Sequence, residues 1–580
     1  MEKVHQIGAS MIASFHKNFR HATLNFIFIL IFVNLFQRIF GMENSIVGVI
    51  FTIMMSASMV RDLTATPVRH LCIQTVVLFL MAAAACFVAN APPVFALPVN
   101  LAMIFLILYA FTYEYVSHLY FPYILSYLFL VFISPVTPDR LPKRLLGVFA
   151  GAVCIILYQL INGRKRVVET ARDVLVSMIG HADECIGCLL SGRGAPRNPE
   201  QLREELCKLS QIVYDRRRKA LCISDASFAM IDAGRGLENL VLLLYEMEGP
   251  ITPPRAGMLR YISCCLTRLR AYMLRETAYL APICREDLGG EQNGEAERFL
   301  NCLQYIRSRM LSMTQPQKKK QYRKTLLSLS VRLKAALRVS PVRVVYALRV
   351  SILLALCTLL VQQLGLPHGK WLLFTVASVS LPYADDVGLK AKKRMVATLV
   401  GGLCSVMLFS LIPSPSGRTA VMMLSGYLSF YFTDYSATYS CSTVGALGGA
   451  VFMGMFGFGQ VGYMSLVRLS YIALGILIAL LANKVFFPFR RATATRQLWN
   501  KYLSTTELLT RVCRDPGADP QLYYGLVIQA HLQEDKLCQN AKELNWEGAQ
   551  ELLEKCRRAV RMAHRTGWEP QSGGPALQEN

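Results

Sequence analysis

A group of cations stands at the beginning of an apolar run in the second half of the chain. Lys393 and Arg394 are followed by Thr398 and Gly401, about one and two helical turns later. A guanidinium group offers paired donors to a carboxylate and keeps its charge when partly dehydrated, and Thr398 can add a hydroxyl on the same helix face. Glycine at position 401 leaves room for a neighbouring backbone or a ligand. These residues are candidates for binding an organic anion; the alternatives are cations that anchor a membrane span and a glycine that serves close helix packing.

Four further cations extend the candidate set. Arg144 and Arg468 each stand seven residues before a glycine. We expect both near the outer end of a membrane span, where the positive-inside rule disfavours positive charge. With Lys370 they form a candidate cationic exit for an anion, the alternative being anchorage at lipid headgroups. Arg349, early in another apolar run, is the fourth candidate.

Proton coupling would require a titratable group at membrane depth. The candidates are Asp386, Asp62, Asp434 and Glu114. All four lie near the ends of predicted spans, where water can solvate them, and none of them is deep in the membrane. A passive channel would show the same absence of a deep intramembrane acid, so the sequence leaves the energy source open.

The middle of the chain contains one short motif with metal-ligand residue types. His181, Cys185 and Cys188 stand close together, with Cys264 and Cys265 as conceivable partners. No second C-x-x-C completes a site, and a helix over residues 167–190 would bury the two thiols. We therefore expect neither a metal nor another cofactor.

The sequence motifs of several enzyme classes are incomplete or absent. Residues 365–370 read G-x-x-x-G-K, one residue short of a phosphate-binding loop, and Trp371 stands where serine or threonine should follow. The sequence contains no G-x-S-x-G and no H-E-x-x-H. We therefore expect that the protein is not an enzyme.

Composition points to a membrane protein. The 580 residues are 53% hydrophobic and 17% charged, and the net charge is +24. The mean hydropathy is +0.35 although a long middle stretch is polar. This composition excludes disorder and disfavours an ordinary soluble protein. Because basic residues flank the apolar runs, we expect contact with a lipid bilayer and no binding of nucleic acid.

Twelve apolar runs are long enough to be membrane spans, several of them only just. Six precede the polar middle and six follow it: 22–39, 45–60, 70–90, 98–113, 118–135, 141–161, 344–361, 370–384, 395–412, 419–433, 441–458 and 465–487. Most cation-rich ends fall on one side if both termini are cytoplasmic. We therefore predict a cytoplasmic N-terminus (1–20), a first transmembrane repeat (21–163), a cytoplasmic helical domain (164–340), a second transmembrane repeat (341–490) and a cytoplasmic helical C-terminal region (491–580).

The two halves align with each other. Six pairs of residues of the same type are separated by 323 to 325 positions: Arg20 and Arg343, Gly41 and Gly365, Asp62 and Asp386, Arg69 and Arg394, Arg144 and Arg468, Gly151 and Gly475. Such agreement indicates an internal duplication. Six spans per unit give both units the same orientation, so the predicted fold class is an all-α membrane protein with two parallel six-helix repeats.

A family resemblance rests on motifs in the second half. They are Tyr346-Ala347-Leu348-Arg349, His368-Gly369-Lys370-Trp371, Thr375, Pro382, Lys393-Arg394, Thr398, Gly401-Gly402, Arg468, Gly475 and Pro488. This order resembles the fusaric acid resistance family of membrane proteins, which includes aromatic acid exporters and is related to plant malate channels of the aluminium-activated type. The family layout of helices covers the whole chain. In the first half Val76 stands where a glycine would be expected.

The resemblance implies export of small organic anions, typically aromatic carboxylates, with coupling to protons as one option. We expect a bacterial inner-membrane transporter whose partners are the anion, the bilayer and either a homo-oligomer or an envelope protein. One alternative is a passive organic-anion channel of the same fold. A second is a membrane-anchored sensor or scaffold whose cytoplasmic helices do the work.

Overall fold

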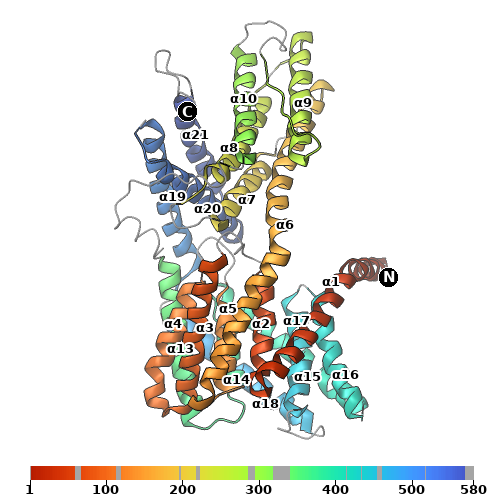
Figure 1. Cartoon of the computed structure of the whole chain (residues 1–580), viewed down its shortest axis with the longest axis vertical. Helices are drawn as coiled ribbons and strands as arrows, with labels where there is room; N and C mark the ends of the chain where they lie inside the picture. Colours follow the sequence, from red (N-terminus) through yellow and green to blue (C-terminus); the bar gives the residue numbers. More distant parts are fainter. Residues whose placement is uncertain are drawn as a thin grey trace. The chain divides into compact units, whose positions relative to one another are not determined.

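A computed structural model describes residues 2–58, 67–112, 119–194, 198–216, 222–247, 249–284, 294–315, 317, 340–412, 414–432, 434–452, 460–486, 488–515 and 517–568. Helices dominate these residues, and no β-strand occurs among them (Figure 1). The chain divides into two compact units. The first comprises Met1–Val60, Val68–Leu157 and Val339–Arg491, and the second comprises Arg61–Pro67, Tyr158–Arg338 and Ala492–Asn580.

Each of the twelve predicted apolar runs contains a helix. The first six are α1 (Glu2–Phe40), α2 (Ser45–Ser58), α3 (Pro67–Asn90), α4 (Pro93–Phe111), α5 (Tyr120–Phe132) and α6 (Leu141–Leu190). The other six are α13 (Pro341–Gln363), α14 (Lys370–Val379), α15 (Asp386–Leu411), α16 (Pro415–Leu428), α17 (Tyr435–Phe452) and α18 (Val461–Val485).

These twelve helices differ in length and in how apolar they are. Among the described residues, seven helical stretches are long and apolar enough to cross a membrane: Ala22–Phe40, Pro67–Asn90, Pro93–Phe111, Pro138–Ile161, Pro341–Gln363, Asp386–Leu411 and Val461–Val485. Helices α2, α5 and α14 are apolar but shorter. The all-helical membrane character is thus confirmed, whereas the number of spans that can be assigned by these criteria is smaller than the twelve predicted.

Small residues allow close helix packing around α15. A Cβ atom at Gly401 would lie 2.6 Å from the carbonyl oxygen of Ser440 on α17. A Cβ atom at Gly402 would overlap the hydroxyl of Ser465 on α18. Helix α15 therefore approaches α17 on one side and α18 on the other, as only a glycine surface permits.

Helices of the two halves also pack against each other. Helix α13 lies along α4, and the side chain of Arg343 donates to the carbonyl oxygen of Tyr109 at 3.1 Å. Helix α1 contacts α16, where the hydroxyls of Thr23 and Tyr427 are 2.8 Å apart. The first helix of each half thus contacts the fourth helix of the other.

Equivalent glycines of the two halves have similar surroundings. Gly41 (φ +88°) and Gly365 (φ +55°) follow the first helix of each half in a conformation that favours glycine. Gly151 of α6 packs against the ring of Phe51 on α2, and Gly475 of α18 packs against Thr375 on α14. Positions 51 and 375 are separated by 324 residues, as are positions 151 and 475.

Among the residues that the structure describes, the second unit contains the end of α6 and seven further helices. These are α7 (Pro199–Arg216), α8 (Asp225–Glu246), α9 (Pro253–Leu274), α10 (Gly294–Thr314), α19 (Arg491–Arg514), α20 (Pro520–Leu544) and α21 (Ala549–Trp568). Helix α8 packs against α7 and α10, and α20 packs against α7 and α21. Helices from the middle of the chain and from its C-terminal region therefore share one compact unit.

Candidate functional site

Arg394 lies two turns into α15 and is buried. Only 4% of its surface is exposed, and the centre of its guanidinium group lies 3.9 Å from the ring centroid of Tyr439 on α17. One turn earlier on α17, the ring centroid of Tyr435 lies 4.4 Å from that of Tyr439. The ammonium nitrogen of Lys390 lies 3.4 Å from the Tyr435 centroid. A cation over an aromatic face is attracted by the negative face of the ring.

Arg468 lies on α18 and is buried in a similar setting. Its exposed fraction is 7%, and its guanidinium centre lies 5.1 Å from the ring centroid of Trp371 on α14. The ring of His368 is stacked with that of Trp371 at a centroid distance of 5.1 Å. Each buried arginine thus has one aromatic ring from a different helix beside it.

The structure brings these two arginines together. Their positive charges are close enough to repel each other. In the predicted topology Arg394 stands at the cytoplasmic end of its span and Arg468 at the outer end of another. In the structure α15 and α18 meet where Gly402 faces Ser465, and the two charges interact. We call Trp371, Arg394, Tyr439 and Arg468 the arginine–aromatic cluster.

Several nitrogens of this cluster have no hydrogen-bond partner within the described part of the chain. They are Nε and Nη1 of Arg394 and Nε of Arg468, and all three are buried. Neither arginine forms an ion pair with any residue that the structure describes. A buried cation without a counter-charge is costly, and two that repel each other are more so. The cluster therefore offers charged donors that an anion would satisfy.

The other candidates on α15 support the cluster in different ways. The hydroxyl of Thr398 is buried and donates to the carbonyl oxygen of Arg394 at 2.9 Å. Gly401 is covered by the backbone of Ser440, as the close-packing alternative expects. Lys393 is partly exposed and lies 3.4 Å from a carboxylate oxygen of Asp434. That carboxylate also accepts from the backbone N–H of Ser436 at 2.8 Å, so it caps the beginning of α17.

Two other buried arginines bind backbone carbonyls. Arg349 donates to the carbonyl oxygen of Leu381 at 2.6 Å, which ties α13 to the segment after α14. Arg144 donates to the carbonyl oxygens of Glu43 at 2.9 Å and Ser134 at 3.2 Å. Arg144 and Arg468 occupy equivalent positions in the two halves of the chain. The guanidinium group of Arg144, however, connects the two backbone segments that contain Glu43 and Ser134.

Lys370 begins α14 next to Trp371 and is half-buried. It forms no ion pair with the residues that the structure describes. Its position makes it the nearest of the remaining candidates along the chain to the arginine–aromatic cluster.

The proton-coupling candidates fall into two groups. Asp386 is held by Arg491, whose Nη2 lies 2.6 and 2.7 Å from the two carboxylate oxygens. Asp434 caps α17, as described above. Asp62 and Glu114 lie outside the described residues.

The motif of His181, Cys185 and Cys188 lies in the second unit. Cys185 is fully buried, and its sulfur lies 3.8 Å from Nε2 of His181, which is itself 2.9 Å from the hydroxyl of Tyr245. Cys188 is half-buried, and Cys264 is exposed. Among the described residues there is no group of three or more histidine, cysteine or acidic side chains that could hold a metal ion.

The motif His368-Gly369-Lys370-Trp371 contains one ring of the cluster, but the pairing of rings with arginines was not predicted from the sequence. The i, i+4 spacing of Tyr435 and Tyr439 was the available signal, since it places both rings on one helix face. Which cation this face meets depends on the packing of α15 against α17.

Residues 355–482 match the family model described as fusaric acid resistance protein-like. The chain carries a fusaric acid resistance protein-like region. All four residues of the arginine–aromatic cluster lie inside this region, and the resemblance inferred from the sequence is confirmed. Inner membrane protein YccS of Escherichia coli strain K12 is 29% identical over 89 residues, which cover 15% of this chain and 12% of that protein. No solved structure matches the chain. The fusaric acid resistance protein-like region and the apolar helices together identify a membrane protein.

Proposed function

We propose that the protein transports small organic anions, aromatic carboxylates in particular, out of the cell across the inner membrane. The observation that carries this proposal is the pair of buried guanidinium groups of Arg394 and Arg468, which repel each other and have unpaired nitrogens. A carboxylate between them would supply the missing charge and accept from the unpaired donors. The rings of Trp371 and Tyr439 would give the apolar part of an aromatic acid a surface to pack against.

The proposal includes a duplicated membrane part with both termini and residues 164–340 in the cytoplasm. Three observations support the duplication: the positive φ of Gly41 and Gly365, the matching neighbours of Gly151 and Gly475, and the reciprocal contacts of α1 with α16 and of α13 with α4. Labelling of single cysteines with an impermeant reagent tests the orientation. Efficient labelling in intact cells of a cysteine placed at Gly289, which lies outside the described residues, would contradict it.

Export driven by protons and passive flow through a channel remain the two modes of transport to separate. A proton ionophore abolishes accumulation against a gradient in the first case and leaves downhill flux unchanged in the second. The ion pair of Asp386 with Arg491 and the capping role of Asp434 favour structural roles for these two acids.

A sensor or scaffold is the second candidate, because the second unit has its own buried core, including Leu206, Leu237 and Leu266. A soluble protein in which residues 158–338 are joined to 492–580 tests it. If that protein alone restores the phenotype of a deletion strain, the scaffold replaces the transporter.

The sharpest test of the anion site uses Arg468→Gln in the full chain. We expect this exchange to raise the thermal stability of the ligand-free protein, because it removes one of two repelling buried charges. We also expect benzoate to stabilise the native protein against heat and to lose that effect in the variant. Arg69→Gln, an exchange at an exposed arginine, is the control and should retain the benzoate effect. A variant that is no more stable than the native protein and responds equally to benzoate would overturn the proposal.

A further inference from the structure

A cleft of about 1300 Å³ opens within the second unit. Its walls come from α7, α8, α20 and α21 and from the segment between α20 and α21. Ligand pockets in proteins commonly have volumes of several hundred to about a thousand Å³, and they combine apolar walls with a few converging polar groups. The cleft is therefore large enough for an organic molecule, and it is separate from the arginine–aromatic cluster.

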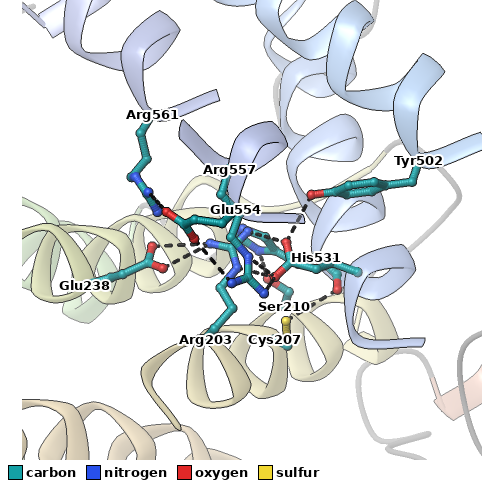
Figure 2. A network of polar contacts seen from close by, with 10 residues as sticks. Arg203, Cys207, Ser210, Glu238, Tyr502, His531, Glu554, Arg557 and Arg561 are labelled. Atoms are coloured by element: carbon teal, nitrogen blue, oxygen red, sulfur yellow. Dashed lines mark hydrogen bonds and ion pairs between the residues drawn. The ribbon is translucent and has the colours of Figure 1, made fainter. Parts of the chain in front are cut away.

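One part of the cleft is closed by paired charges. Glu534 is fully buried. Its Oε1 atom lies 2.6 Å from Nε of Arg203 and 2.7 Å from Nη2 of Arg557. Arg203 also reaches Glu238 at 3.3 Å, and the hydroxyl of Tyr502 donates to Glu534 at 3.3 Å. Figure 2 shows Arg203 and Glu238 facing each other, with Arg557 and Tyr502 extending toward the same centre. Burial raises the pKa of the Glu534 carboxyl, but the charges of Arg203 and Arg557 outweigh it and lower that pKa to about 2.

The cations that line the cleft are all engaged. Arg203 and Arg557 bind Glu534, Arg558 and Arg561 bind Glu554, and Lys542 lies 3.6 Å from Glu204. An anionic ligand would have to displace one of these pairs. The cleft therefore does not present a free cation to an anion, in contrast to the arginine–aromatic cluster.

The acids that line the cleft outnumber these cations by eight to five. Glu246 and Glu547 are exposed and form no ion pair within the described part of the chain. Glu246 is the last residue of α8, and Glu547 follows the end of α20. The backbone N–H of Asn198, just before α7, donates to the hydroxyl of Tyr245 at 3.1 Å. The side-chain amide of Gln550 on α21 donates to the carboxylate of Glu200 on α7 at 2.5 Å. The lining of the cleft is thus acidic although the whole chain is strongly basic.

Aromatic and aliphatic side chains line the same cleft as these acids. Tyr245 and Trp546 are lining residues, and both are half-buried. Leu202, Leu242 and Leu553 continue the apolar wall. An aromatic ring beside carboxylates favours an organic cation, which gains both cation–π attraction and ionic attraction.

We propose that this cleft binds an organic cation with an apolar body. The ammonium group binds to the carboxylates of Glu246 and Glu547 and to the rings of Tyr245 and Trp546, and the apolar body contacts Leu202, Leu242 and Leu553. The paired arginines and glutamates of the closed part hold the walls together and do not bind the charge. The site does not depend on the proposed transport function, because all of its residues belong to the second unit.

Binding of benzyltrimethylammonium to the purified full chain in non-ionic detergent tests the proposal by calorimetry. The probes benzoate and benzyl alcohol have a similar body with negative or no charge. We expect saturable binding of the cation and weaker binding of both comparison probes. The double variant Glu246→Gln/Glu547→Gln should weaken cation binding about tenfold or more, and Trp546→Leu should weaken it about threefold or more.

Glu507→Gln is the matched control, since Glu507 is an exposed acid of α19 that does not line the cleft. It should bind the cation as the native protein does. Glu246 and Glu547 are both exposed, so their exchange should leave thermal stability unchanged. The absence of saturable binding at millimolar benzyltrimethylammonium, equal affinity for benzoate, or native affinity in the double variant would each overturn the proposal.

Discussion

Arg491 and Asp386 form an ion-paired junction at the beginning of α15, within the first unit. Nη2 of Arg491 lies 2.6 and 2.7 Å from the two carboxylate oxygens of Asp386. The backbone N–H of Arg491 donates to the side chain of Asp385 at 2.8 Å, and the N–H of Ala384 donates to the carbonyl oxygen of Phe489 at 2.9 Å. Since α15 carries Arg394 two turns later, this junction fixes the end of the helix that positions the candidate anion site.

The junction leads to a prediction about Asp386→Asn. Arg491 is 8% exposed and would lose its counter-charge, so we expect the free energy of unfolding to fall by about 1–3 kcal/mol. Transport with and without a pH gradient should fall by the same factor, since the carboxylate holds a helix end and does not carry protons. The measurements are thermal unfolding and vesicle uptake at two gradients. A variant of native stability that loses only the gradient-dependent uptake would instead make Asp386 the proton carrier.

Helix packing at Gly401 gives a second prediction. A methyl group there would lie 2.6 Å from the backbone oxygen of Ser440, so Gly401→Ala should force α15 and α17 apart and cost about 1–3 kcal/mol. Gly388, on the same helix, has nothing within 4 Å of an added Cβ atom. Gly388→Ala should be neutral or stabilising by up to about 1 kcal/mol, because alanine favours the helix. Equal thermal unfolding of the two variants would show that α15 does not pack as described.

The helices were predictable from the sequence, and their contacts were not. Apolar runs and their flanking glycines locate each helix because hydrophobic length and turn residues are local signals. The meeting of Arg394 with Arg468 depends on where α15 crosses α18, and no local pattern records that crossing. The pair Arg203 and Glu534 is likewise separated by 331 residues. Charge on isolated helices suggests solvated faces, whereas in the folded second unit these two side chains form a buried pair.

The buried carboxylate of Glu534 predicts how the second unit responds to pH. Its pKa is lowered from 4.5 to about 2 in the folded protein. The unfolded chain therefore binds this proton first as the pH falls, and the stabilisation is complete above the unfolded pKa and lost as the pH falls from about 4.5 through 2. Unfolding followed by the tryptophan fluorescence of the full chain should show this loss.

Removing the charge of Glu534 should be costly at neutral pH. Glu534→Gln leaves Arg203 and Arg557 buried without their shared counter-charge, so we expect a loss of about 3–5 kcal/mol. The variant should also lose the steep acid dependence below about pH 4.5. Glu507→Gln on α19 should retain native stability and native acid dependence. A Glu534→Gln protein as stable as the native one would mean that the carboxylate and the two arginines do not meet.

The last prediction separates recognition by Arg394 from simple anchoring. Arg394 is buried in the arginine–aromatic cluster, whereas its sequence counterpart Arg69 is exposed on α3. Lysine keeps the charge but loses the planar fork that binds a carboxylate by two parallel hydrogen bonds. Arg394→Lys should therefore cost about 1–3 kcal/mol of anion binding, a weakening of roughly 5- to 150-fold. Arg69→Lys should have no effect on anion binding, because Arg69 is exposed and lies outside the arginine–aromatic cluster. The measurement is the apparent affinity for benzoate in membrane vesicles, after expression and insertion of both variants have been verified. Equal and native affinities in both would remove Arg394 from the anion site and leave Arg468 as a buried charge whose counter-ion must come from elsewhere.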